Sequence, residues 1–291
     1  MGLHIEGAAL THVGRVRSNN EDNYCLFGKY RQNTDVNLQY DTGVLVLGQA
    51  AVGVFDGMGG EEAGEAASLM AATAFTPCGL NEIRKEGQRQ MQSANEEICR
   101  KMKKDGIRMG ATASVLYLDG ERAVSCNVGD SRCYLMRKKV LRQLSVDHSE
   151  ARKMVELGIL TPEEARRSMS RHRLTQHLGI MPDEFMIEPY FSPVIDLQPG
   201  DVFLLCSDGL TDMLSDEEIE TILSQWEYAE NMADVLVSVA LRHGGKDNVT
   251  ALVLVVREEN YHVRQRAALR DHGKGGFLNC ILSHLAGYLS G

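Results

Sequence analysis

The chain has 291 residues, of which 43% are hydrophobic and 24% are charged, and its formal net charge is −9. This composition allows a soluble protein with one large domain or two small ones. The acidic balance argues against a nucleic-acid-binding protein, whose binding surface is basic, and no stretch has the ~18 apolar residues that a membrane-spanning helix needs. The seven cysteines include no Cys-x-x-Cys pair, which indicates reduced thiols and a cytoplasmic protein.

The N-terminal part alternates between apolar runs, which are typical of buried strands, and polar loops. The segment 14–27 carries Arg17 and the acidic pair Glu21 and Asp22. Residues 28–43 have no hydrophobic pattern, so a polar loop is expected there. The strands that the apolar runs predict are 5–13, 24–27, 44–47 and 52–55.

Residues 52–68 bring a single carboxylate to the end of a strand. An apolar run leads to Asp56, a glycine-rich turn begins at Gly57, and the small residues from Ala63 to Ser68 indicate the start of a helix. A carboxylate beside an exposed backbone carbonyl is what a hard divalent cation binds. Asp-Gly is also a very common turn sequence, so this stretch taken alone is weak support for a metal site.

The rest of the chain predicts helices, hairpins and one polar insertion, without an internal repeat or a linker. Thr161, Pro162, Glu163 and Glu164 indicate a helix start inside the insertion, 147–183, which is expected to lie over the sheet. The other predicted elements are helices at 61–76 and 80–104, antiparallel hairpins at 111–130 and 131–145 with Lys138 and Lys139 at the second tip, strands within 186–206, a helix capped by Ser215 and Glu218, a helix at 230–243 and a last strand at 246–256.

A single domain is therefore predicted for 1–257, followed by a tail, 258–291. Apolar residues of the tail would share one face of a helix: Phe277, Leu278, Ile281, Leu282, Leu285 and Leu289. Such a helix is expected to dock on this domain or on a partner. Contact with a membrane surface is the weaker alternative, because Lys and Arg are scarce on the opposite face.

Acidic residues recur at predicted strand ends in four separate segments. Asp56 and Asp208 each follow an apolar run and precede a glycine. Asp130 follows a predicted strand, and Asp247 precedes the last one. Any one of them could form a turn, but converging carboxylates would repel one another unless a cation neutralised them. Neither cysteine nor a His-x-x-x-His pair accompanies them, and oxygen ligands select Mg²⁺ or Mn²⁺ over zinc.

Six short motifs follow one another along the chain: RSNNED at 17–22, DGMGGEEAGEAAS at 56–68, GAT at 110–112, NVGDSRCY at 127–134, CSDGLTD at 206–212 and KDNVT at 246–250. In this order they resemble the type 2C metal-dependent protein serine/threonine phosphatases, in their bacterial form. The resemblance covers about residues 5–257. It implies an α+β fold, a four-layer α-β-β-α sandwich of two stacked antiparallel sheets flanked by helix pairs, and identifies 147–183 as a flap beside the active site.

The resemblance also implies which residues form the site. Two ions, Mn²⁺ or Mg²⁺, would share Asp56, with a third and weaker site beside them. The implied metal ligands are Glu21, Asp22, Asp56, the Gly57 carbonyl, Asp130, Asp208, Asp212 and Asp247. The implied catalytic residues are Arg17, Asp56 and Asp208, with the Arg17 guanidinium suited to two phosphate oxygens.

By the same resemblance, a hydroxide that bridges the two metals attacks phosphorus directly, without a phospho-enzyme. Met58 stands where many eukaryotic members carry a histidine, so the proton donor for the leaving group is open and metal-bound water is the default. Ala111 replaces the commoner threonine, a change expected to be tolerated. His148, His172 and His177 fall in or near the flap, where one of them could touch the substrate, but none is assigned a catalytic role.

The function that follows is a cytoplasmic phosphatase of phosphoserine and phosphothreonine in proteins, acting against a partner serine/threonine kinase in signalling. One alternative is a non-catalytic binding module with the same fold, which the loss of Asp56, Asp208 or Asp247 would favour. All three are present. Another alternative is a phosphatase of a different phosphoester, because the flap sequence does not reveal specificity.

Overall fold

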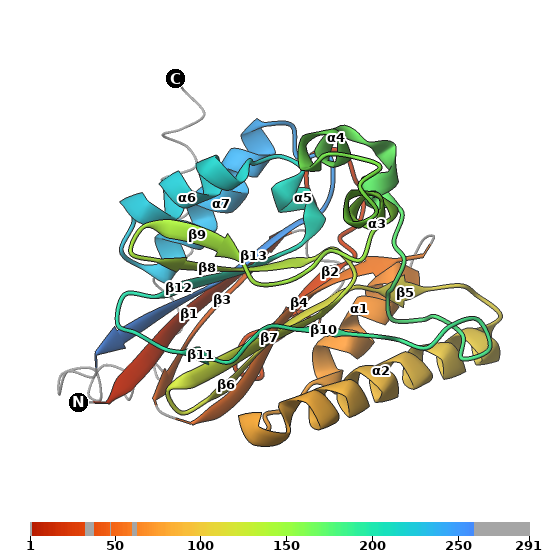
Figure 1. The fold of residues 1–291 in the computed structure, drawn as a ribbon, viewed down its shortest axis with the longest axis horizontal. Coiled ribbons are helices and arrows are strands. Elements are labelled where there is room, and N and C mark those ends of the chain that lie inside the picture. Colours follow the sequence, from red (N-terminus) through yellow and green to blue (C-terminus); the bar gives the residue numbers. More distant parts are fainter. Residues whose placement is uncertain (1, 33–37, 47, 60–62, 259–291) are drawn as a thin grey trace. The chain divides into compact units, whose positions relative to one another are not determined.

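Two antiparallel sheets form the body of the molecule (Figure 1). The computed structural model describes residues 2–32, 38–46, 48–59 and 63–258, and Leu3–Arg257 form one compact unit. The six-stranded sheet contains, in spatial order, β3 (Leu38–Val46), β1 (Leu3–His12), β13 (Val249–Glu258), β12 (Val202–Cys206), β8 (Arg132–Arg137) and β9 (Val140–Gln143). The seven-stranded sheet contains β10 (Tyr190–Phe191), β7 (Arg122–Val128), β6 (Ala113–Asp119), β4 (Gln49–Met58) and β2 (Asp22–Cys25), with β11 (Ile195–Asp196) beside β7 and β5 (Gly110–Ala111) beside β4.

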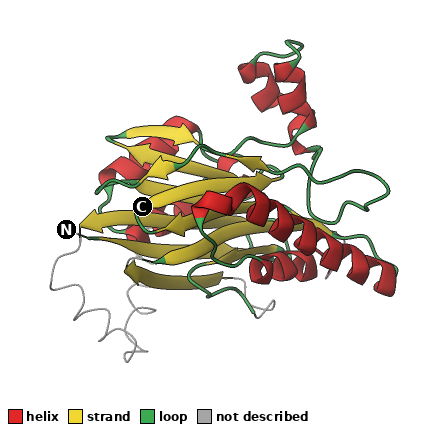
Figure 2. Cartoon of the chain, turned by 60° about the horizontal axis from the view of Figure 1, so that its bottom comes forward, coloured by secondary structure: helices red, strands yellow, loops and turns green. Residues whose placement is uncertain are grey.

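Helices cover the outer face of each sheet, which gives four layers (Figures 1 and 2). The covering helices are α1 (Ala63–Ala74) and α2 (Ile83–Asp105), with the short η1 (Leu80–Glu82), on the seven-stranded sheet, and α6 (Asp216–Gln225) and α7 (Ala229–Arg242) on the six-stranded sheet. Alternation along β4 shows how the layers separate: Val52 and Val54 lie in the core between the sheets, whereas Ala51 and Phe55 lie under the helices. The expected α-β-β-α sandwich is confirmed.

Local sequence signals fix several element ends. Gly106, with φ of 70°, closes α2, and Ser215 forms a capping box at the start of α6. Lys138 and Lys139 have φ of 53° and 64°, the left-handed backbone that a two-residue hairpin tip requires. Both predicted hairpins are present, but they lie in different sheets, β6–β7 in one and β8–β9 in the other.

The expected polar loop at 28–43 is wrong over its second half. Strand β3 begins at Leu38 and pairs with β1 from His12 to His4. It is an edge strand whose side chains are all partly or fully exposed, so it lacks the hydrophobic pattern that marks a buried strand. Its backbone pairing with β1, which sequence patterning does not reveal, makes it a strand.

The insertion predicted at 147–183 contains a compact part, residues 149–174, and from here on the word flap means these residues only. It comprises α3 (Glu150–Glu156), α4 (Pro162–Arg167) and the short η2 (Met169–His172), and α4 begins at the capping box predicted at Thr161. The flap closes on itself where Ser149 pairs with Leu174. The following residues return to the core, where Leu178 is fully buried and pairs with Ala111.

Among the described residues, no helix has the length and apolar character to span a membrane. The tail beyond Glu258, with its predicted amphipathic helix, lies outside the described residues.

Candidate active site

A cavity of about 800 Å³ brings the acidic strand ends together. Its walls come from the loop between β1 and β2, from β4, from the turn after β7, from α5 (Asp208–Thr211) directly after β12, and from the residues before β13. Seven of the nine residues that the sequence singled out line it: Arg17, Glu21, Asp56, Gly57, Asp130, Asp208 and Asp247. Five carboxylates from five distant segments therefore face one space.

Two glycines allow these segments to approach one another. A Cβ on Gly57 would lie 2.1 Å from the carbonyl oxygen of Gly64, and a Cβ on Gly209 would lie 1.9 Å from that of Asn248. No side chain fits at either position without displacing backbone. The glycine that follows Asp56 and the glycine that follows Asp208 are thus needed to hold the carboxylates in place.

Asn248 joins the two segments that carry Glu21 and Asp247. Its Oδ1 accepts a hydrogen bond of 2.7 Å from the backbone N–H of Glu21, and its Nδ2 donates to the carbonyl oxygens of Val13 and Asn19 at 2.9 Å each. The residue pattern around Asn248 does not by itself indicate this role. The signal was its position directly after Asp247 in a motif, which does not reveal a partner more than 200 residues away.

Asp22 lies below the cavity and does not line it. Its side chain is fully buried, and its Oδ2 accepts hydrogen bonds from the Ser207 hydroxyl at 2.7 Å and the Thr250 hydroxyl at 2.6 Å. Burial raises the pKa of Asp22 to about 7 in spite of these bonds. The residue thus ties β2 to the segments beside Asp208 and Asp247.

The carboxylates of the cavity destabilise one another's ionised forms. Burial, followed by the charges of neighbouring acids, raises the pKa of Asp56 and of Asp130 well above the ordinary value. Burial alone would also raise the pKa of Asp208, but its interactions with His172 and Asp56 lower it. Buried like charges of this kind are stabilised by a cation. The donor set, carboxylates with the Gly57 carbonyl and no cysteine, fits a hard divalent metal.

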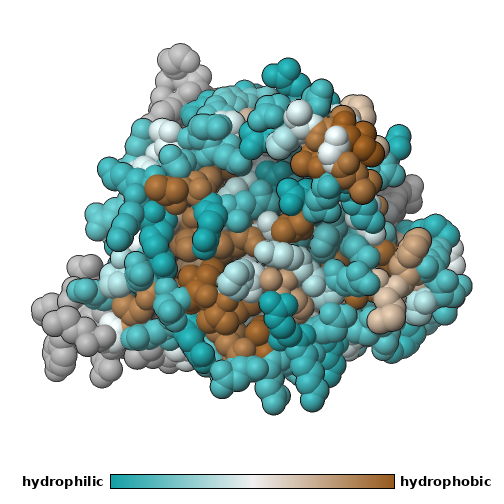
Figure 3. All heavy atoms as spheres, viewed as in Figure 1, coloured by the Kyte–Doolittle hydropathy of each residue, from teal (hydrophilic) through white to brown (hydrophobic). Residues whose placement is uncertain are grey.

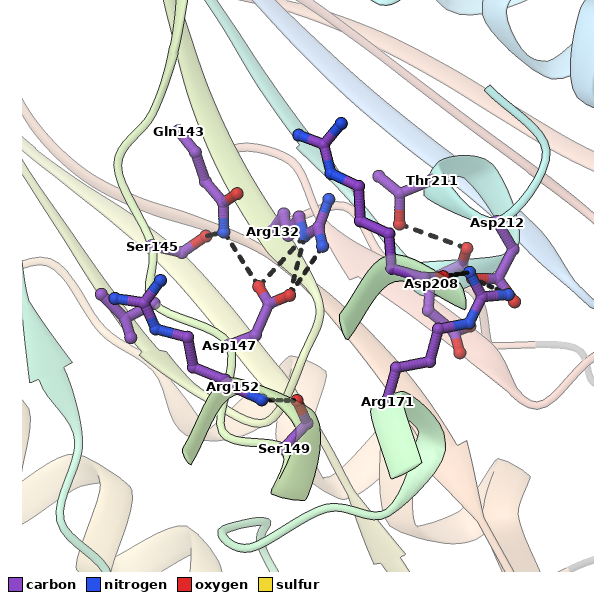
Figure 4. A network of polar contacts seen from close by, with 12 residues as sticks. Arg132, Gln143, Ser145, Asp147, Ser149, Arg152, Arg171, Asp208, Thr211 and Asp212 are labelled. Carbon is purple, nitrogen blue, oxygen red and sulfur yellow. Dashed lines mark hydrogen bonds and ion pairs between the residues drawn. The ribbon is translucent and has the colours of Figure 1, made fainter. Parts of the chain in front are cut away.

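Asp212 lies outside the cavity lining and faces the flap (Figure 4). Its Oδ1 lies 3.1 Å from Nη2 of Arg171, and its Oδ2 lies 3.7 Å from Nε2 of His172. His172 Nδ1 lies 3.8 Å from Oδ2 of Asp208. One ligand atom each of His172, Asp208 and Asp212 lie within 4.8 Å of one another, so these three residues could hold a metal ion.

Arg17 forms an ion pair at the mouth of the cavity. Its Nη2 lies 2.7 Å from Oδ2 of Asp247, and its side chain is 52% exposed. The hydrogen bond to Asp247 raises the pKa of Arg17 further, so its charge is permanent. An arginine held here but open to solvent can meet an anion entering the cavity.

Two of the three histidines that the sequence placed near the flap line the cavity, together with Leu174: they are His172 and His177. His148 has another position, in which its backbone N–H donates to the Gly129 carbonyl at 2.9 Å and its Nδ1 accepts from the Gly129 N–H at 3.2 Å. His148 thereby holds the turn that presents Asp130.

Comparison with known proteins agrees with this geometry. The model of the protein phosphatase 2C family matches residues 13–154, and that of the stage II sporulation protein E family matches residues 156–257. The chain is 34% identical to the serine/threonine phosphatase Stp of Listeria monocytogenes, over 84% of this chain and 93% of that protein. It is 34% identical to the protein phosphatase PhpP of Streptococcus pneumoniae, over 88% and 99%.

Solved structures give the same picture. The crystal structure of the serine/threonine phosphatase PstP/Ppp of Mycobacterium tuberculosis superposes with a TM-score of 0.73 at 30% identity, over 88% of this chain and all of that one. The catalytic domain of PstP in complex with two manganese ions superposes with a TM-score of 0.70, also at 30% identity and over the same shares of the two chains.

A four-layer sandwich with a carboxylate-lined cavity at its strand ends, together with these relatives, defines the class of the molecule: the chain belongs to the protein phosphatase 2C family. Within that family it is a protein serine/threonine phosphatase, as the sequence motifs predicted.

Proposed function

We propose that this chain removes phosphate from phosphoserine and phosphothreonine in proteins, with two divalent cations, Mn²⁺ or Mg²⁺, held at the cavity floor. The observation that carries the proposal is the convergence of five carboxylates with Arg17 around one cavity. When bound, such ions lower the pKa of water and stabilise negative charge on a phosphoryl group.

The residues that would hold the cations are assigned from their positions. Asp56 is acted on by the charges of Asp22, Asp208, Asp130 and Asp247, so we assign it the central, shared position. The other proposed ligands are the Gly57 carbonyl, Glu21, Asp208 and Asp247 in the cavity, with Asp22 supporting them from below. A third, weaker site is proposed at Asp130, Asp208 and Asp212.

Arg17 is proposed to bind and orient the phosphoryl group. Its guanidinium offers two N–H donors in a fixed plane, which matches two oxygens of a phosphate. Its present partner, Asp247, leaves it half exposed and free to meet an entering anion. The proposed substrates are phosphorylated proteins, and the proposed partner is the kinase that phosphorylates them. The protein is proposed to be cytoplasmic, with a phosphatase domain that ends near residue 257.

The test is hydrolysis of a phosphothreonine peptide after EDTA treatment, with and without added Mn²⁺, by the wild type and by Asp208→Asn. We expect turnover that requires Mn²⁺ and is lost in Asp208→Asn. Absence of turnover in the wild type with Mn²⁺ bound would instead favour the non-catalytic binding module.

A further inference from the structure

The flap is anchored at its base by a partly buried network of polar side chains (Figure 4). Both Nε and Nη2 of Arg132, on β8, donate to the carboxylate of Asp147, at 3.0 and 2.7 Å. Gln143 donates to the same carboxylate at 2.9 Å. The Arg132 side chain is 24% exposed and that of Asp147 18%, so water screens the pair only partly.

Asp147 stands directly before the flap stem. On either side of it, the Val146 carbonyl accepts from Asn127 at 2.7 Å, and His148 is bonded to Gly129. The stem itself is closed where the N–H of Glu150 donates to the carbonyl of Arg173 at 2.9 Å. The chain is therefore fixed over residues 146–148, where it leaves the core for the flap, and Asp147 supplies the side-chain contact of this segment to β8.

A second chain of hydrogen bonds links Arg132 to α4 of the flap through Tyr134 and Asp216. Nη1 of Arg132 donates to the Tyr134 hydroxyl at 2.9 Å, which in turn donates to Oδ1 of Asp216 at 3.1 Å. Oδ2 of Asp216 accepts from Arg166 of α4 at 3.2 Å. Two neighbouring side chains of β8 thus hold the flap at two points, its base and α4.

We propose that Arg132 and Asp147 are positioning residues that fix the flap over the cavity mouth and thereby set the affinity for phosphorylated peptides and proteins. This inference rests on the proposed phosphatase function. The flap contributes His172 and Leu174 to the cavity wall and extends beyond it. A peptide, which projects from the cavity, meets the flap over a larger surface than a small phosphate ester does.

Strand β8 supplies a matched control at its other end. Arg137 donates to Asp201 through Nε at 2.7 Å and Nη2 at 2.6 Å, the same two-point arrangement, but this pair is not part of the flap network. Asp147→Asn and Asp201→Asn each remove one charge from an Arg–Asp pair on one strand. Only Asp147→Asn removes an anchor of the flap.

The experiment measures KM and kcat for a phosphothreonine peptide and for p-nitrophenyl phosphate, with Mn²⁺, together with hydrogen exchange of residues 149–174. For Asp147→Asn we expect the peptide KM to rise about fivefold, the upper end of what a partly exposed ion pair contributes. The KM for the small ester should change less than about twofold, and hydrogen exchange in the flap should become faster. For Asp201→Asn we expect a lower melting temperature with both KM values and flap exchange unchanged.

A milder variant tests the inference in case Asp147→Asn does not fold. Arg166→Gln removes only the outer anchor, and we expect a smaller rise in peptide KM in the same direction, whereas Arg152→Gln, whose pair with Glu156 lies inside α3, has no effect. Equal changes for the two substrates, or unchanged flap exchange in Asp147→Asn, would overturn the inference. A wild type without turnover contradicts the phosphatase proposal instead, and hydrogen exchange then still decides whether the pair positions the flap.

Discussion

The floor of the cavity, by which we mean the segments that carry Glu21, Asp56, Asp130, Asp208 and Asp247, and the flap beside it are held in place by different sets of contacts. Buried hydrogen bonds and close backbone contacts fix the floor, as at Asp22 beneath it and at Gly209. Side-chain ion pairs together with the backbone contacts at its base fix the flap, and α4 contains no buried residue. Figure 3 shows that apolar side chains gather on the surface, and three of the exposed apolar residues, Leu157, Ile159 and Met169, belong to the flap. Rigid strand ends suit metal chemistry, whereas a flap held by polar contacts at the surface suits the recognition of a protein substrate.

The largest effect on the cavity floor is expected from the addition of one methyl group at Gly209. In Gly209→Ala the new Cβ would lie 1.9 Å from the Asn248 carbonyl oxygen, so backbone must move. We expect a loss of about 3 kcal/mol of stability, measured by urea unfolding, and loss of phosphatase activity. Gly158→Ala in the flap is the control, because nothing lies near its Cβ and only its φ of 68° opposes the change. It is expected to cost about 1 kcal/mol. Equal losses of stability in Gly209→Ala and Gly158→Ala would contradict the proposed difference between the floor and the flap.

The next largest effect concerns the phosphate-binding arginine at the mouth. We expect Arg17→Ala to lower kcat/KM for a phosphothreonine peptide about 100-fold and Arg17→Lys about tenfold, because lysine keeps the charge but loses the two-pronged geometry. Mn²⁺ binding, measured by calorimetry, should change little. Full activity of Arg17→Lys would show that charge alone is needed.

The acidic residues of the cavity floor should make the stability of the metal-free protein depend on pH. Asp56 and Asp130 have raised pKa values in the folded protein and Asp22 titrates at about 7, whereas free aspartate titrates near 4. The folded state therefore holds protons that the unfolded state releases as the pH rises above about 4, and for Asp22 this window ends near pH 7. Stability from these groups is complete below that window and is lost as the pH rises through it.

We accordingly expect the EDTA-treated protein to melt a few degrees lower at pH 7.5 than at pH 5.5, and Mn²⁺ to restore stability at pH 7.5. Calorimetry of the wild type and of Asp130→Asn measures this, and the variant should show a weaker dependence. If the melting temperature of the EDTA-treated protein instead rises with pH over this range, the pKa values of the acidic residues of the floor are not raised.

The smallest effects come from two capping boxes of the same type. Ser215 caps α6, which packs on a sheet, and Thr161 caps α4 of the flap. Ser215→Ala is expected to cost about 1 kcal/mol of global stability. Thr161→Ala should leave the melting temperature unchanged and affect only hydrogen exchange within the flap. A global loss in Thr161→Ala would show that the flap unfolds together with the core.

The sequence predicted the floor better than the flap, for physical reasons. Asp56 and Asp208 follow apolar runs and precede glycines, so local patterning locates them. The contacts of Asn248 and of Asp22 join segments far apart in the chain, and a single sequence does not reveal such pairs. Strand β3 was missed because its side chains are exposed. The ion pair that Arg132 of β8 forms with Asp147 at the base of the flap depends on tertiary placement, which composition does not reveal.

Calorimetric titration of the EDTA-treated protein with Mn²⁺, in the wild type and in Asp56→Asn, decides whether the carboxylates of the cavity form the metal centre. If the converging carboxylates hold the catalytic metals, the wild type binds more than one ion and Asp56→Asn loses the tightest binding and phosphopeptide turnover together. Wild-type affinity and stoichiometry in Asp56→Asn would contradict the assignment of the cavity floor as the metal centre.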